Sequence, residues 1–370
     1  MSHKEAFRVN NFDLIRLFAA SEVALRHTLD RFGMEDSWLC ECTSWLPGVP
    51  IFFFVSGFLI SKSYESNSRI GEYARNRILR IYPALILCVL LAFLSVLTTG
   101  YLATQSYTFS GIAVWLLGQM TFVQFYNPAF MREFGTGVFN GSLWTVTVEL
   151  QFYVLIPMIY WLLARIVKRG MNLNMVLIGL ILLFVLGNLG YKHLSESQPS
   201  AMTTKLFMVT FVPWIFMFLI GILAQKNFVS IYRFIIGRTL PILLAYGCLT
   251  FFCIRFLGWK TGNEVHPALF PFLAIVVLAL AYNAPTLADR ILHKNDISYG
   301  VYIYHAPIIN LMIFYGYSTK TLDVIVALAL TVTMAIISWL CLERIAIRKK
   351  KRPSMNMDAG SDPASQTHLG

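Results

Sequence analysis

Charged residues are scarce in this sequence: Asp, Glu, Lys and Arg make up 13% of its 370 residues, whereas 57% are hydrophobic. The mean hydropathy is +0.62. A soluble protein of this length has too little interior to hide so much apolar surface. Apolar runs of about 18 to 22 residues recur, each long enough to cross a hydrocarbon core about 30 Å thick. These features exclude a soluble enzyme and predict an all-α, polytopic transmembrane helical bundle.

Paired cysteines are also lacking. Cys40 and Cys42 are too close in sequence for a relaxed mutual disulfide and have no partners for a zinc site. The other four cysteines are scattered, mostly within apolar runs, so we interpret all six as small apolar fillers. We expect no bound metal. No internal repeat, soluble accessory domain or cleavable signal peptide is expected either, because the first apolar run starts near residue 11 without a following cleavage site.

The distribution of Lys and Arg indicates how the chain crosses the membrane, because these residues accumulate on the cytoplasmic side. With ten crossings and both termini cytoplasmic, the predicted inner segments hold 21 of the 30 Lys and Arg residues. A further apolar stretch, 109–126, would place every later basic cluster outside if it crossed, so we expect it to be re-entrant or interfacial. The net charge of +11 therefore reflects topology rather than nucleic-acid binding. The predicted spans lie near 11–29, 46–63, 78–99, 143–164, 174–190, 205–225, 239–257, 267–283, 298–316 and 322–343.

The same reading divides the chain into three parts. We expect residues 1–10 to form a cytoplasmic N-terminus and residues 11–347 to form one transmembrane domain. The segment 348–370 starts with a basic run and continues with Pro, Ser, Asp, Gly and Ala. We expect it to be a disordered cytoplasmic tail, held at the anionic inner leaflet by its basic residues.

His27 follows Arg16 by eleven positions in the first predicted span. Eleven steps of 100° return a helix to within about 20° of its starting face, about 16 Å along the axis. The guanidinium and the imidazole then share one stripe, with Asp13 one turn earlier on the same side. Ionisable groups inside a membrane span are costly and rarely kept without a use, so we interpret this stripe as the centre of the chemistry. Alternatively, Arg16 snorkels to the headgroups and His27 is merely solvated.

Arg77 and Arg80 come just before the third predicted span, on its inner side, with Arg75 close by. Residues three apart are neighbours on a helix surface. Two fixed guanidinium groups suit a phosphate-bearing cytosolic ligand. The alternative is ordinary anchoring at the inner membrane surface.

Glu149 lies within two turns of the outer end of the predicted span 143–164, at a depth similar to that of His27. A carboxylate there would orient and charge-stabilise a neighbouring imidazole. A structural hydrogen bond between helices is the alternative. Trp144, Gln151 and Tyr153 belong to the same segment and are further pocket candidates.

Two more spans contain residues that suit a pocket. The Ser56–Gly57 pair permits close backbone approach, which in membrane helices usually means packing, and Ser56 is also a pocket candidate. His305 lies mid-span, two residues before Pro307, which frees backbone carbonyl groups. Its imidazole is expected to bond those groups, to line the cavity, or both. Tyr299 on the same segment is a further candidate.

Together these segments resemble the acyltransferase 3 family of bacterial integral-membrane acyltransferases, over about residues 11–343. Each motif is weak alone, but five occur in register. They are Asp13, Arg16 and His27 (Arg, ten residues, His); Phe54-Val-Ser56-Gly57-Phe58-Leu59; Arg77-x-x-Arg80-x-x-Pro83; Trp144 followed by Val148-Glu149-x-Gln151-Phe-Tyr153; and Ser298-Tyr299 followed by His305.

In that family, a cytosolic acyl-CoA donates an acyl group, commonly acetyl, to a hydroxyl of a glycan exposed across the membrane. The resemblance therefore implies an O-acetyltransferase of the bacterial inner membrane that uses acyl-CoA (acetyl-CoA) as its donor. It implies a surface polysaccharide as acceptor, such as lipopolysaccharide O-antigen or exopolysaccharide, or a lipid-linked precursor. His27 and Arg16 would be the essential pair, and Arg77 with Arg80 would contact the coenzyme.

The sequence departs from the family pattern in three ways. Asn76 stands where many members carry another basic residue, so Arg75 is expected to share the donor contacts. The glycine often found between Asp13 and Arg16 is absent. No hydrolase-like domain is fused to the bundle, so any second catalytic step is expected to need a separate protein.

These residues suggest a mechanism. We expect His27 to act as general base on the acceptor hydroxyl, with Glu149 orienting it. Arg16 would stabilise developing negative charge or hold the donor. A transient acyl-histidine is the alternative route. From another class of function, a transporter or flippase of lipid-linked sugars is the main rival, but its signature of paired, broken helices in related halves is not evident.

Overall fold

The structure, a computed structural model, describes residues 9–349. Over this range the backbone forms helices and short helical turns and no strand, as the apolar runs predict. Residues 1–8 of the predicted N-terminal segment, and residues 350–370 of the predicted tail, lie outside the described part. The main helices are α2 (Phe12–Arg31), α3 (Trp38–Ser44), α4 (Gly48–Ser66), α5 (Ile70–Thr98), α6 (Phe109–Gln119), α7 (Leu143–Val167), α8 (Leu173–Ser197), α9 (Met202–Met208), α10 (Ile215–Lys226), α11 (Phe228–Ile235), α12 (Thr239–Leu257), α13 (Phe270–Tyr282), α14 (Leu287–Leu292), α15 (Ser298–Phe314), α16 (Thr321–Ser338) and α17 (Arg344–Arg348).

Six helical segments of the described chain are long and apolar enough to cross a membrane, so the molecule is a multi-pass membrane protein. The segments are Trp38–Ser66, Ile70–Thr98, Leu143–Val167, Leu173–Ser197, Thr239–Leu257 and Thr321–Arg348. Each corresponds to a predicted span. A seventh is formed if α10 and α11, which meet at 86°, are taken together.

The remaining predicted spans include helices that are too short or too polar to cross a membrane by these criteria of length and apolarity. The helix α2 has 20 residues but includes six charged side chains. The helices α13 and α15 have 13 and 17 residues, about 20 Å and 26 Å in length. Most side chains of both are buried against neighbouring helices. Because protein rather than lipid surrounds them, these helices tolerate a length or a polarity that a lipid-facing span would not.

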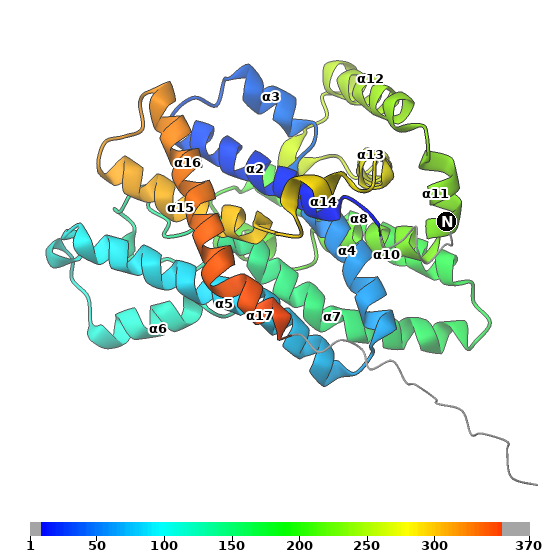
Figure 1. Ribbon diagram of the computed structural model, residues 1–370, viewed down its shortest axis with the longest axis horizontal. Helices are drawn as coiled ribbons and strands as arrows, with labels where there is room; N and C mark the ends of the chain where they lie inside the picture. The colour runs from blue at the N-terminus through cyan, green and yellow to red at the C-terminus, as the bar shows by residue number, and fades with distance from the viewer. Residues whose placement is uncertain (1–8, 350–370) are drawn as a thin grey trace, which may run out of the picture.

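The stretch 109–126 forms the short helix α6 and a series of turns. With 11 residues, α6 is about 16 Å long, half the thickness of a hydrocarbon core. It folds back beside the end of α5 (Figure 1), where Trp115 packs edge-on against Phe93 with ring centroids 6.1 Å apart. A helix of this length does not cross by itself, which agrees with the predicted re-entrant or interfacial placement.

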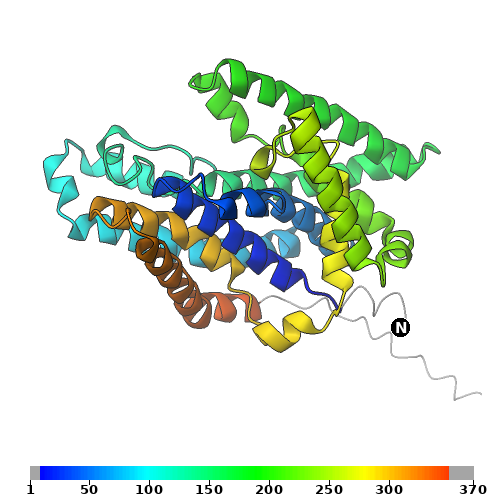
Figure 2. The same cartoon turned by 90° about the horizontal axis from the view of Figure 1, so that it is seen from above.

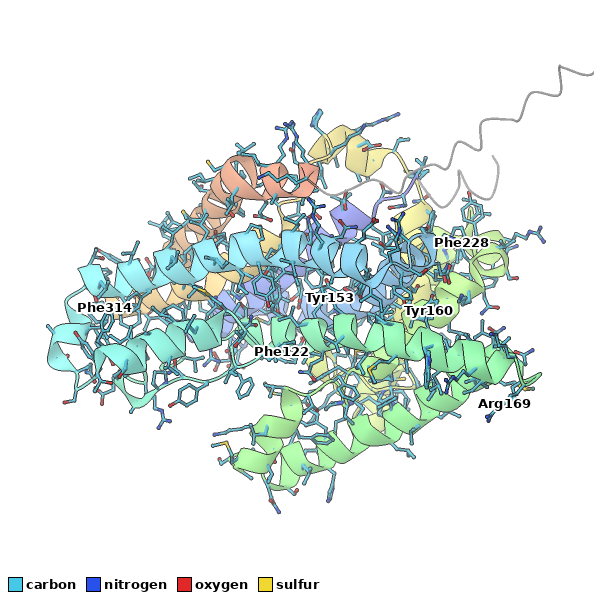
Figure 3. All side chains as sticks on the ribbon, turned by 90° about the horizontal axis from the view of Figure 1, so that it is seen from below. Phe122, Tyr153, Tyr160, Arg169, Phe228 and Phe314 are labelled. Carbon is cyan, nitrogen blue, oxygen red and sulfur yellow. The ribbon has the colours of Figure 1, made fainter. Side chains whose placement is uncertain are left out.

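The bundle has two distinct ends. Phe314 lies at one end, Arg169 lies at the other, and Tyr153 lies between them (Figure 3). The helices α2 and α15 lie side by side along this direction in both ribbon views (Figures 1 and 2). Residues that the sequence places on opposite sides of the membrane therefore lie at opposite ends of the molecule.

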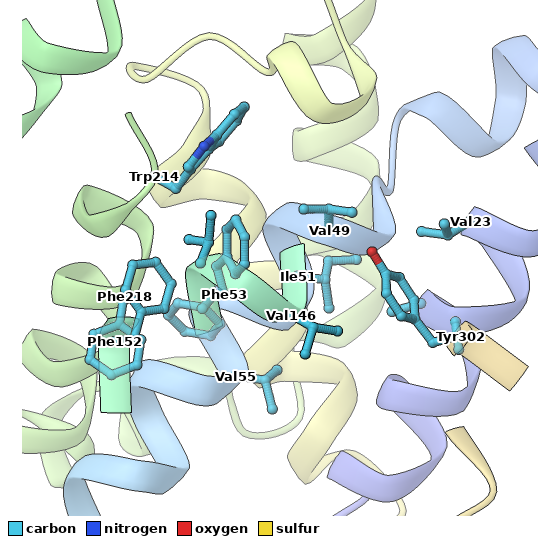
Figure 4. Packing of buried hydrophobic residues seen from close by; sticks show 14 of the residues in the cluster. Val23, Val49, Ile51, Phe53, Val55, Val146, Phe152, Trp214, Phe218 and Tyr302 are labelled. Atoms are coloured by element: carbon cyan, nitrogen blue, oxygen red, sulfur yellow. The ribbon is translucent and has the colours of Figure 1, made fainter. Parts of the chain in front are cut away.

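Close backbone packing joins α4 to α10 at the centre. A Cβ atom at Gly57 would lie 2.0 Å from the Phe218 carbonyl oxygen, and one at Gly221 would lie 2.4 Å from the Phe54 carbonyl oxygen. The small residue at position 57 thus permits the approach that the sequence indicated. Around this contact, Phe152 packs on Phe218 with ring centroids 4.7 Å apart (Figure 4). This core holds α4 and α7 rigid, and both contribute to the cavities described next.

Candidate active site

The helix α2 presents both of its predicted functional side chains to α15. The Arg16 Nη1 donates to the Asp296 Oδ2 at 2.9 Å, just before α15 begins. The His27 Nδ1 lies 2.9 Å from the His305 Nε2, within α15. Arg16 and His27 therefore share the face of α2 that the spacing of eleven residues predicts.

An inner cavity with about 1000 Å³ of empty space opens at the end of the bundle where α2 and α15 begin. Four cationic and three acidic side chains line it, which leaves a formal excess of one positive charge. The charged residues are Arg16, Arg77, Arg80, Lys294, Asp13, Glu149 and Asp296. This excess favours an anionic ligand.

Asp296 connects three helices at the wall of the inner cavity. Its Oδ2 accepts from both Arg16 and the Arg80 Nη2, the latter at 2.5 Å. Its Oδ1 accepts from the backbone and the hydroxyl of Ser298, at 3.2 and 2.5 Å, which satisfies the first turn of α15. Burial opposes ionisation, but Arg16 and Arg80 hold the pKa of Asp296 well below its usual range. The carboxylate thus fixes α2, α5 and α15 at one point.

Arg77 differs from Arg80 in having no acidic partner. Its guanidinium lies over the rings of Tyr73 and Tyr153, 5.8 and 5.6 Å from their centroids. Its Nε is buried without a hydrogen-bond partner, and no carboxylate of the described residues lies within 4.0 Å of it. This cation is held in place by aromatic rings while its polar edge remains available to a ligand.

Arg75 does not join this group, contrary to the prediction that it shares the donor contacts. Its side chain is exposed, and its Nη2 donates to the Lys349 carbonyl oxygen at 3.3 Å. Positions 75 and 77 lie 200° apart around α5, whereas positions 77 and 80 lie only 60° apart. A helix that directs Arg77 and Arg80 into the cavity must direct Arg75 away from it.

Glu149 does not contact His27, so the predicted orienting role at that imidazole is wrong. Its Oε1 accepts from the Ser56 hydroxyl at 3.3 Å and from the Tyr153 hydroxyl at 2.5 Å. These contacts place it in the wall of the inner cavity. The reason is direction rather than depth: α7 begins at Leu143, as predicted, but the Glu149 side chain faces Ser56 of α4, whereas Trp144, nearer the start of α7, lines a cavity together with His27.

His305 takes the place that was predicted for Glu149. It is fully buried, and its ring lies 5.1 Å from that of His27, centroid to centroid. The sequence predicted that His305 bonds the carbonyl groups freed by Pro307, lines the cavity, or both, but this residue is not among those that line the inner, middle or outer cavity. The structure gives it the His27 imidazole as a partner.

His27 also lines an outer cavity with about 930 Å³ of empty space. The predicted pocket residue Trp144 lies in its wall, together with Phe125 and Arg31. The amide groups of Asn140 in this wall are occupied by structural hydrogen bonds to Ser142 and to the Ile303 carbonyl. The outer cavity therefore offers aromatic faces, the His27 imidazole and one cation to a ligand.

Gln151 lines none of these cavities, contrary to its prediction as a pocket residue. Its Nε2 donates to the Val209 carbonyl at 2.7 Å, and its Oε1 accepts from the Phe211 amide at 2.9 Å. It satisfies backbone groups of the segment between α9 and α10. The helical position of Gln151, two residues beyond Glu149, turns it away from the cavity side of α7.

A middle cavity lies between the inner and outer ones along the same helices. On α7, Tyr153 lines the inner cavity, Glu149 the inner and middle cavities, Val146 and Thr145 the middle cavity, and Trp144 the outer cavity. The predicted pocket residues Ser56 and Tyr299 also line the middle cavity. The three cavities therefore form a row, the path from the Arg77 guanidinium to His27, and none of the residues named above lines both its middle and its outer cavity.

Sequence reasoning missed two contributors to this path. Asp296 was not selected, although an acidic residue two positions before Ser298 is a pattern typical of a helix start. Tyr302 was also missed, and its hydroxyl lies 2.5 Å from the Thr145 hydroxyl across the path. No local pattern distinguishes Tyr302 from the other tyrosines of α15. Among the described residues, no group of three or more His, Cys, Asp or Glu is placed to hold a metal ion.

Comparison with known proteins gives one family. A family model described as an acyltransferase domain matches residues 9–343. Nodulation protein 10 of Rhizobium leguminosarum bv. viciae is 29% identical over 354 residues, which cover 92% of this chain and 93% of the relative. An O-acetyl transferase of Shigella phage Sf6 is 26% identical over 166 residues, covering 40% of this chain and 44% of the relative.

A longer relative is O-acetyltransferase OatA of Staphylococcus aureus, which is 24% identical over 359 residues. The match covers 91% of this chain but only 57% of that relative. No solved structure matches the chain significantly.

Proposed function

Because this chain belongs to the acyltransferase 3 family and is an acyltransferase, we propose that it moves an acetyl group from cytosolic acetyl-CoA to a glycan hydroxyl. Two relatives are named as O-acetyltransferases, which supports acetyl and oxygen as the group and the acceptor atom. The observation that carries the proposal is the path between Arg77 and His27. It joins a site for an anionic donor to a site for a neutral base.

The donor binds first in the inner cavity. Its phosphates contact the unpaired guanidinium of Arg77, and Arg80 adds positive potential beside it. A fixed guanidinium binds phosphate with two parallel hydrogen bonds, which orients the donor as well as holding it. The thioester arm then extends along the middle cavity toward His27.

His27 is the general base, and His305 orients it. When the His27 Nδ1 carries a proton and donates it to the His305 Nε2, the His27 Nε2 keeps its lone pair for the acceptor. The hydroxyl proton moves to the His27 Nε2 while the acceptor oxygen attacks the thioester carbon. The C–S bond breaks, and the proton passes to the leaving sulfur to give the free thiol. The other route, a transient acyl-histidine, uses the same nitrogen.

Arg16 holds the donor rather than the reacting oxygen. Eleven residues of helix put it about 16 Å from His27 along α2, and Asp296 keeps it at the junction of the inner and middle cavities. Of the two predicted roles, this distance favours donor binding over stabilising charge at the acceptor.

The acceptor is a sugar hydroxyl of a surface polysaccharide or of its lipid-linked precursor. Support comes from the outer cavity, where Trp144 and Phe125 provide flat apolar faces beside His27. Sugar rings pack their C–H faces on such aromatic surfaces. The proposal includes ten crossings in the bacterial inner membrane with both termini cytoplasmic, which puts Arg77 on the cytosolic side and Trp144 outside.

Radiolabelled acetyl-CoA tests the proposal. Membranes containing the wild-type chain are incubated with the labelled donor and glycan, beside membranes with an equal amount of the His27→Ala variant. We expect label in the glycan with the wild-type chain and a loss of 100-fold or more in the variant, because general-base catalysis contributes about 10²–10⁴-fold. Equal labelling by both would refute the role of His27. Absence of label from wild-type membranes would refute the proposed reaction.

A further inference from the structure

The middle cavity has a composition unlike that of its neighbours. Most of its wall is apolar or aromatic, and it is the narrowest of the three cavities. Its lining comes from α2, α4, α7 and α15: Arg16, Val49, Phe52, Phe53, Ser56, Thr145, Val146, Glu149, Tyr299 and Tyr302. It therefore offers a small apolar group a place that the charged inner cavity does not.

The middle cavity communicates with the inner one. Arg16, Ser56 and Glu149 line both cavities, so they form the boundary between them. A molecule whose anionic end is held at Arg77 can extend an apolar end past this boundary.

The opposite end of the middle cavity is closed. The Tyr302 and Thr145 hydroxyls are 2.5 Å apart across it. The Tyr302 ring lies 6.0 Å from the ring of His305, centroid to centroid, and His305 bonds His27. Tyr302 and His305 therefore lie between a group at this end and the His27 base.

Aromatic rings fix the side walls. Phe53 is buried and packs on Phe152 and Trp214, with ring centroids 5.2 and 6.2 Å apart, and Val146 lies between Phe53 and Tyr302 (Figure 4). Phe52 packs edge-on against Tyr302 at 5.5 Å. A ligand group longer than the space between these rings must displace one of the rings. A close-packed wall resists such a displacement.

We propose that the middle cavity binds the acyl end of the donor thioester and that Phe52 limits this end to a short acyl group of two or three carbons. The inference rests on the proposed function, and it adds the selection of donor by acyl length. In the proposed complex, the acyl carbon lies at the Tyr302 end of the middle cavity. Transfer breaks its C–S bond, forms the C–O bond to the acceptor, and passes the hydroxyl proton through His27 to the sulfur.

The test compares donors of increasing length. Purified protein in lipid nanodiscs is supplied with glycan and with acetyl-, propionyl-, butyryl- or hexanoyl-CoA, and kcat/KM is measured for each by mass spectrometry of the product. For the wild-type chain we expect kcat/KM to fall by about 10-fold or more for each methylene beyond propionyl, the scale set by one methylene in a tight pocket. Phe52→Ala should raise the butyryl-to-acetyl ratio by about 10-fold or more.

Phe256→Ala is the matched control. It removes the same ring from α12, where Phe256 is 68% exposed and lines none of the cavities described above. The donor ratio of this variant should equal that of the wild-type chain. Phe52→Leu, which removes less volume, replaces Phe52→Ala if the latter fails to accumulate, and a smaller shift in the same direction is then expected.

Two results would overturn the inference. One is a wild-type enzyme that uses all four donors equally well. The other is a Phe52 variant that transfers acetyl but keeps the wild-type donor ratio. Failure of the proposed function itself would give a different result: no donor would acylate the glycan even with the wild-type chain.

Discussion

The imidazoles of His27 and His305 face one another, with 2.9 Å between the Nδ1 of the first and the Nε2 of the second. Their rings are inclined by 49°. Because one of the two facing nitrogens donates and the other accepts, this contact couples the tautomers of the two rings. The base of the proposed reaction is thus oriented by a neutral side chain rather than by a carboxylate.

His305→Ala should lower kcat about 10- to 100-fold and leave the KM for acetyl-CoA nearly unchanged. Loss of an orienting partner typically has an effect of this size, and His305 lies away from the donor's phosphates. His305→Gln should retain more activity, because its amide oxygen can accept from the His27 Nδ1. Steady-state kinetics of both variants check this. Full kcat in the Ala variant would show that His27 works without its partner.

Arg77→Ala should raise the KM for acetyl-CoA about 10-fold or more with little change in kcat. A hydrogen bond to a charged group is worth about 1.5–3 kcal/mol, and Arg77 has no acidic partner among residues 9–349 to compensate. Arg75→Ala, an exposed position on the same helix, is the control and should behave as the wild-type chain. If Arg75→Ala raises the KM as much as Arg77→Ala, the donor site is not the one proposed.

Asp296→Ala should destabilise the fold by about 3–5 kcal/mol, because removal of one member of a buried ion pair leaves the partner charge uncompensated. Here two guanidinium groups, those of Arg16 and Arg80, would lose their shared acceptor. Chemical unfolding of the purified protein measures the effect. The double variant Asp296→Asn with Arg80→Gln should recover part of the loss, and no recovery would argue against direct coupling of the two side chains.

The contribution of Asp296 should not change between pH 7.5 and pH 5. Despite burial, Arg16 and Arg80 lower its pKa in the folded state below the unfolded value of about 3.9. Stability from such a group is fully present above the unfolded pKa and is lost only as pH falls through the folded one. Unfolding of the wild-type chain and Asp296→Asn across this range gives the difference. A difference that disappears by pH 5 would show that the carboxyl is already protonated.

Gly57→Ala should destabilise the protein by about 1–3 kcal/mol, the usual range for extra volume in a packed core. The added Cβ would meet the Phe218 carbonyl at 2.0 Å and force α4 away from α10. Gly247→Ala on α12 is the control, because nothing lies within 4 Å of the added atom. It should be neutral or stabilising by up to about 1 kcal/mol, since alanine is the better helix former. Thermal unfolding in detergent distinguishes the two variants.

The sequence predicts the helices well, because apolar length and the exclusion of unpaired backbone groups from lipid leave few alternatives. It predicts less well which short helices are buried inside the bundle. The helix α15 has 17 residues and little polarity at either end, and only its neighbours reveal that it lies at the centre. Helical periodicity also explains why Arg16 with His27, and Arg77 with Arg80, were correctly placed on shared faces.

Contacts between different helices could not be predicted from helical periodicity. Glu149 was assigned to His27 from a similar depth in the membrane, yet depth does not set the direction of a side chain, and Glu149 faces Ser56 and Tyr153 instead. Asp296 and Tyr302 became visible only once their partners on other helices were in place.

The sequence by itself determined that the chain is an apolar helical bundle, that Arg16 shares a helix face with His27 and Arg77 with Arg80, and to which family the chain belongs. These properties depend on residues of the same helix, whose relative positions follow from a rotation of about 100° and a rise of about 1.5 Å per residue. The tertiary structure decided which side chains meet: His27 with His305, Arg16 and Arg80 with Asp296, and Arg77 with no acidic side chain of the part of the chain that the structure describes. Such pairings depend on the translation and rotation of whole helices against one another, which the packing of the entire core sets and no local pattern encodes.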